Sequence, residues 1–187
     1  MQILKSFAFY IGLTLCGAAN AAIIETNIGN IETGSVLGDS GWLIEDTFTA
    51  DALNFYTFSI SDAIDLKIEA IADIAIGLSI YSGTISNASG IIFNNDSDFS
   101  DFTTKLEYIA GVSALLPGFD NSPVRALLAS GDYTVAVGGN QGMFDMFSRF
   151  DYSLSFTDAS SINTVSAPPL AFFIAYLAML VITLRKS

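Results

Sequence analysis

The chain has no histidine and a single cysteine, Cys16. Without histidine, neither a serine–histidine catalytic triad nor a histidine-ligated zinc site can form. The cysteine lies in an apolar stretch near the N-terminus, so the rest of the chain has neither a thiol nucleophile nor a disulfide. These absences exclude several common classes of hydrolase and metalloenzyme.

Basic residues are also scarce, with seven lysines and arginines against 19 aspartates and glutamates and a net charge of −12. Three of the seven, Lys5, Arg185 and Lys186, lie near the two ends of the chain, so the middle is more acidic still. A surface of this charge repels nucleic acid and anionic membranes. We therefore expect neither as a partner of the folded part, and the charge also suits the solubility of an exported protein.

The first 21 residues have the three-part form of a secretory signal peptide. Lys5 precedes the apolar stretch Phe7–Leu15, and the small residues Ala19 and Ala21 follow it. This pattern predicts a signal helix over residues 1–21, recognition by the secretion machinery, and cleavage after Ala21.

The C-terminal segment, residues 164–187, combines two prolines, an uncharged apolar run and a basic end. The run Leu170–Leu184 spans 15 residues, which as a helix cover about 22 Å of a bilayer core about 30 Å thick. Arg185 and Lys186 can snorkel to make up the difference, and they favour the cytoplasmic side. Because the run is apolar all round, it favours a transmembrane helix, with a buried core helix as the alternative.

In its motif, its short apolar span and its basic end, this segment resembles the PEP-CTERM sorting signal of Gram-negative bacteria. The family motif Val-Pro-Glu-Pro is matched by a variant without the glutamate, in Val165, Ser166, Ala167, Pro168 and Pro169. The resemblance implies an exosortase-type enzyme that removes the tail and an intermediate tethered to the inner membrane. It further implies a final place at the cell surface or outside the cell, in association with exopolysaccharide or biofilm.

Residues 22–163 are predicted to form one all-β domain, an antiparallel β-sandwich or jelly roll. Apolar and polar residues alternate with the period of a half-buried strand in several segments. Strands are therefore expected near 53–60, 64–70, 74–80, 133–137 and 152–156, with weaker candidates at 91–93 and 105–109. The pair Gly138 and Gly139 predicts a turn, and residues 112–128, with two prolines, predict a long loop with a short helix.

The order of these segments is similar to that in bacterial pre-peptidase C-terminal domains, small β-sandwiches of secreted proteins. The resemblance rests on three pieces of the family pattern. They are a Tyr-x-Phe strand at Tyr56, a Leu-x-Leu-Tyr strand at Leu78, where this chain has Ile80 in place of the second leucine, and a Gly-x-Tyr-x-Val strand at Gly131. It spans roughly residues 45–156. It implies an accessory or binding module, and in some members of the family a calcium site.

An acidic stretch at residues 94–101, NNDSDFSD, is the candidate metal site. Calcium takes six to eight oxygen ligands from carboxylates, amides and carbonyls. A tight loop could turn the side chains of Asn94, Asp96 and Asp98 inward, and Asp101 could close the shell. The alternative is an acidic hairpin loop exposed to solvent.

Aromatic side chains offer a second kind of site, because they could stack on sugar rings. The candidates are Trp42, Tyr56, Tyr81, Phe99, Phe102 and Phe144. Packing in the sandwich core is the alternative for each. The sequence thus favours a non-enzymatic surface or matrix protein that associates with extracellular polysaccharide. The competing hypothesis is a carbohydrate-binding accessory module or a weak envelope glycoside hydrolase that uses two carboxylates.

Overall fold

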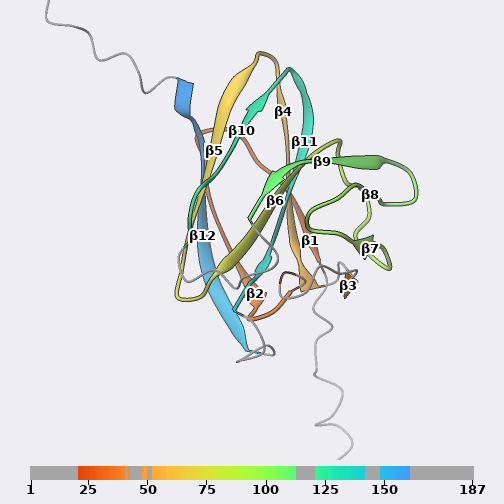
Figure 1. Ribbon diagram of the computed structural model, residues 1–187, viewed down its shortest axis with the longest axis vertical. Helices are drawn as coiled ribbons and strands as arrows, with labels where there is room; N and C mark the ends of the chain where they lie inside the picture. The colour runs from red at the N-terminus through yellow and green to blue at the C-terminus, as the bar shows by residue number, and fades with distance from the viewer. Residues whose placement is uncertain are drawn as a thin grey trace, which may run out of the picture.

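The computed structural model describes residues 21–40, 42, 48–49, 52–112, 121–141 and 148–160. This part of the chain is all-β, with two sheets packed face to face (Figure 1). The expected β-sandwich is therefore confirmed. Within these ranges no helix is long and apolar enough to cross a bilayer. The predicted signal helix and the tail at 164–187 lie outside the described residues.

One layer is a six-stranded sheet in which β1 pairs parallel with β4 and every other neighbouring pair is antiparallel. Its strands, in spatial order, are β1 (Ala22–Glu25), β4 (Asn54–Ile60), β11 (Gly131–Gly139), β6 (Ile76–Ser82), β9 (Lys105–Gly111) and β8 (Phe99–Ser100). β11 and β6 lie in its middle.

The other layer is a four-stranded antiparallel sheet. Its spatial order is β10 (Val124–Leu128), β5 (Ile64–Ala72), β12 (Arg149–Asp158) and β2 (Ile31–Leu37). A short pair outside both layers joins β3 (Phe48–Thr49) to β7 (Ile92–Phe93).

The main core lies between the two sheets, where the inward residues of alternating strands meet. Leu66 and Ile68 of β5 and Leu154 and Phe156 of β12 face Val135 of β11 and its neighbours across the gap. All five are buried to within 1% of complete. Burial of such side chains stabilises the fold by about 1.5–3 kcal/mol each. Burial alternates with a period of two along β5 and β12, whereas β11 is buried on both faces from Tyr133 to Gly139 and is not the half-buried strand that was predicted.

A second core covers the opposite face of the six-stranded sheet. The chain between β6 and β9, residues 83–104, folds back over this face and carries β7 and β8 with it; we call it the cap segment (Figure 1). Phe93 of the cap packs against Phe55 and Tyr81 of the sheet, and against Trp42 and Phe99. The central strands of the six-stranded sheet, β4, β11 and β6, are therefore covered on both faces.

Trp42 lies flat in this second core, over two glycines of neighbouring strands. A Cβ on Gly77 of β6 would overlap the indole ring, and a Cβ on Gly138 of β11 would lie 2.5 Å from Cζ3 of Trp42. Gly138 and Gly139 are the last residues of β11 and do not form a turn, so that prediction is wrong. These glycines allow the indole ring to pack closely against the strands. In the sequence, glycines of this kind cannot be told apart from glycines in turns.

Other segments also differ from what the sequence predicted. Residues 124–128, expected in a loop with a short helix, form the edge strand β10. β6 begins at Ile76, and all of its residues from Ile76 to Tyr81 are buried, so it is no half-buried strand. β1 and β2 were not predicted, because apolar and polar residues do not alternate regularly along their sequences, AIIE and IETGSVL.

Candidate functional site

The cap segment is attached to the sheet by hydroxyl groups from β6. Ser79 Oγ donates a short hydrogen bond to the backbone carbonyl of Asn95, and Tyr81 OH donates one to that of Asn94. Burial raises the pKa of the Tyr81 hydroxyl, which stays protonated and able to donate. The acidic stretch is thus positioned by neutral donors on the outer face of the sheet.

Asp101, at the end of this stretch, is a buried structural residue with 1% of its surface exposed. Its carboxylate accepts five hydrogen bonds, from N and Oγ of Ser86, N and Oγ1 of Thr103, and N of Thr104. Burial by itself would raise the pKa of this carboxyl, but the hydrogen bonds from Ser86, Thr104 and Thr103 outweigh it and hold the pKa below its ordinary value. Asp101 therefore joins the β8–β9 turn to the start of the cap.

The four predicted calcium ligands do not converge on one point. Oδ1 of Asn94 accepts the backbone N–H groups of Asp96 and Ser97, while Asp101 points to Ser86 and its own turn. Within the described ranges, no three acidic, histidine or cysteine side chains are grouped so that they could hold a metal ion. As placed, these residues do not fit a shared oxygen shell, and calcium binding stays a prediction.

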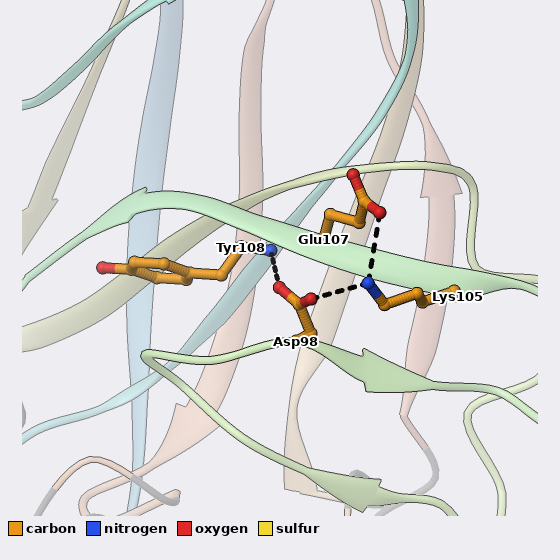
Figure 2. A network of polar contacts seen from close by, with 4 residues as sticks. All are labelled: Asp98, Lys105, Glu107 and Tyr108. Carbon is orange, nitrogen blue, oxygen red and sulfur yellow. Dashed lines mark hydrogen bonds and ion pairs between the residues drawn. The ribbon is translucent and has the colours of Figure 1, made fainter.

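Asp98 joins the cap segment to β9 through a small charged network (Figure 2). Its carboxylate accepts the backbone N–H of Tyr108 at 2.9 Å and lies 2.8 Å from Nζ of Lys105. The same ammonium lies 3.1 Å from the carboxylate of Glu107. Lys105, together with the Tyr108 N–H, holds the pKa of Asp98 below its ordinary value, and Asp98 and then Glu107 raise the pKa of Lys105.

Beside this network the cap forms an open hollow of about 470 Å³. The walls are mostly apolar and include a few polar side chains; they consist of Gly90, Ile91, Ile92, Asn94, Asp98, Phe99, Ser100 and Phe102. Ile92 is 63% exposed and Phe102 74% exposed, so both side chains are open to a ligand. Concave sites that combine apolar walls with a few polar groups are typical of ligand binding.

Phe102 adopts a backbone conformation that is unfavourable for a large side chain. Its φ is +74°, and among the described residues no other side-chain-bearing residue has a positive φ. The left-handed region costs an L-residue about 1–2 kcal/mol. Asp101, Thr103 and Thr104 hold the turn in place around it. Phe102 is thus held in a strained backbone conformation although its exposed ring contributes little to the core.

The aromatic residues predicted to stack on sugars therefore fall into a buried group and an exposed one. Four of them are buried, so the alternative prediction, that they pack in the core, is confirmed for Trp42, Tyr56, Tyr81 and Phe99. Phe102 is exposed in the hollow, and Phe144 lies outside the described residues. Sequence reasoning missed Ile92, and the row of apolar residues before Asn94 gave no sign that this one would face solvent.

No protein-family model matches the sequence, and no curated protein matches it either. Several solved structures are similar in fold. The surface-associated copper-binding protein CorA of Methylomicrobium album BG8 aligns with a TM-score of 0.52 at 9% identity, over 74% of this chain and 98% of its own. This alignment supports the sandwich fold.

Two further structures align with lower TM-scores. The pre-peptidase C-terminal domain of a Bacillus anthracis collagenase aligns at 0.41 and 16% identity, over 73% of this chain and 96% of its own. The periplasmic lysozyme inhibitor PliG of Aeromonas hydrophila aligns at 0.45 and 12% identity, over 74% and 96%. At these identities the likeness concerns the fold alone, and membership of the pre-peptidase class stays a prediction, as does the sorting signal.

Proposed function

We propose that this protein is exported and acts at the cell surface or in the extracellular matrix, without catalysis, as a binder of extracellular polysaccharide. The observation that carries the proposal is the hollow in the cap, where the fold holds Phe102 exposed at an unfavourable φ. The face of an aromatic ring carries partial negative charge, which attracts the C–H groups of a pyranose ring. Asn94, Asp98 and Ser100 beside it can hydrogen-bond sugar hydroxyls.

The carboxylates near the hollow favour binding over hydrolysis. A glycoside hydrolase needs one carboxylic acid whose pKa is raised enough to donate a proton. In the cap segment, Asp98 and Asp101 both have pKa values held below the ordinary value of an aspartate. These groups are ionised at neutral pH and would serve as hydrogen-bond acceptors.

Replacing Phe102 with glycine tests the binding site. Glycine removes the ring and relieves the left-handed strain, while its greater freedom in the unfolded chain offsets part of the gain. We expect polysaccharide affinity to fall about tenfold or more, while the free energy of unfolding stays level or rises by up to about 1 kcal/mol. Affinity electrophoresis and urea unfolding measure the two effects.

A matched control is Leu127→Ala, which removes another exposed apolar side chain, 84% exposed, on β10 of the other sheet. This variant should bind as the parent does. Equal binding by the parent and Phe102→Gly would refute the site, and release of reducing sugar that is lost on replacing one acid would refute the non-enzymatic role.

Export and processing are tested by the intact mass of the protein purified from the cells that make it. We expect a chain that begins at Ala22, the first residue of β1, and that lacks the apolar run Leu170–Leu184. The exosortase-type enzyme would act at the motif from Val165 to Pro169. A chain that still carries residues 1–21 would contradict export, and one that keeps the apolar run would contradict removal of the tail.

A further inference from the structure

The charged side chains around the hollow indicate which charge a bound polysaccharide should carry. Asp98 lines the hollow, and Asp96 lies two residues away on the same exposed loop. Lys105, the cation that contacts Asp98, is shared with Glu107, so two carboxylates balance one ammonium (Figure 2). Together with the exposed Asp96, this group of side chains carries more negative than positive charge, as does the whole chain at −12.

We infer that the hollow binds amine-bearing sugars, such as polymers of hexosamine with free amino groups; the inference rests on the proposed function. An ammonium group is attracted both by the face of Phe102 and by the carboxylate of Asp98, and these two groups line the same hollow. Among the described residues, each oxygen of Asp98 has one partner, so each keeps a lone pair for a further donor.

The same charges oppose two other classes of polysaccharide. Polymers of uronic acids or sulfated sugars would be repelled by Asp96, Asp98 and Glu107. Neutral sugars can stack on Phe102 but gain nothing from the excess charge. Because Asp98 stays ionised well into the acidic range, the attraction persists at the mildly acidic pH where sugar amines are fully protonated.

The test compares short oligosaccharides by calorimetry with the purified full-length protein, below the pKa of the sugar amine. We expect glucosamine oligomers to bind about threefold to tenfold more tightly than their N-acetylated forms and than neutral glucans, and uronic-acid oligomers to bind least. Added salt should remove most of the preference for the amine.

Two aspartate variants separate local charge from net charge. Asp96 and Asp62 are both exposed, and each accepts one hydrogen bond from a neighbouring serine. Asp96→Asn should reduce the preference for the amine form, and Asp62→Asn, on the loop between β4 and β5, should leave it unchanged. An equal loss in both variants would overturn the inference, since net charge alone would then explain the binding.

The sugar panel also separates this inference from the proposed function. Equal binding of amine, N-acetylated and neutral oligomers overturns the inference and leaves polysaccharide binding intact. Failure of every sugar overturns both. Binding of oligolysine as tight as that of glucosamine oligomers, unchanged in Phe102→Gly, would mean a cationic peptide partner and overturn the sugar assignment.

Discussion

Gly77→Ala is expected to destabilise the protein by about 2–3 kcal/mol, because the second core has no room for one methyl group. The three atoms nearest to an added Cβ all belong to the indole of Trp42, and the methyl would overlap that ring. The ring cannot move aside easily, since Phe93 packs against it at 5.3 Å between ring centres and Trp42 is fully buried. Urea unfolding followed by circular dichroism measures the loss.

A double-mutant cycle with Trp42→Leu shows whether the ring is the cause. Leucine keeps an apolar side chain and loses no hydrogen bond to the described residues, because none of them is a partner of Nε1 of Trp42. In the Trp42→Leu background, Gly77→Ala should cost little or should stabilise, since alanine lowers the entropy of the unfolded chain. The same cost in both backgrounds would show that the packing of Trp42 on β6 is not what requires glycine.

Asp101→Ala is expected to cost about 3 kcal/mol, because a buried carboxylate that accepts five hydrogen bonds is lost and its donors are left without an acceptor. Ser86→Ala, which removes one of the five donors, should cost about 1 kcal/mol. Asp62→Asn, an exposed acid, should change stability by less than about 0.5 kcal/mol. A loss for Asp101→Ala no larger than that of Asp62→Asn would contradict the structural role.

The pH dependence of stability gives an independent test of Asp101. Its pKa is lower in the folded protein than in the unfolded chain, so its stabilising effect is fully present above the unfolded value of about 4 and is lost as pH falls below it. The parent should therefore lose more stability between neutral and strongly acidic pH than Asp101→Asn does. Identical acid profiles for the two proteins would show that this carboxylate is not preferentially ionised in the folded state.

The strands of the main core could be predicted from local pattern. β5 and β12 alternate apolar and polar residues because one face of each meets the other sheet and the other face meets water. β4 and β11 were also found, because their aromatic and β-branched residues favour strands whatever covers them. The sequence also drew attention to the acidic stretch at residues 94–101 and to Phe102, which line or border the hollow, but their roles stay predictions.

The rest of the site could not be predicted, for reasons that particular residues make clear. Gly138 looks like a turn residue until Trp42, almost a hundred residues earlier in the chain, is placed against it. The hydrogen-bond partners of Asp98 and Asp101 could not be predicted either, since an acidic stretch has the same composition whether its oxygens accept backbone N–H groups or bind a cation. Phe99 and Phe102 lie three residues apart, yet one is buried and the other exposed.

The sequence by itself thus determined an acidic β-sandwich without histidine chemistry. Composition and net charge are sums over the chain, and strand periodicity depends on neighbouring residues alone, so none of them requires the tertiary structure. The folded chain decided which strands are covered twice, which carboxylates serve the backbone and which aromatic ring faces solvent. Those outcomes depend on the cap segment folding back over β6 and β11. Contacts between segments far apart in the chain produce no periodic pattern in the sequence of either segment.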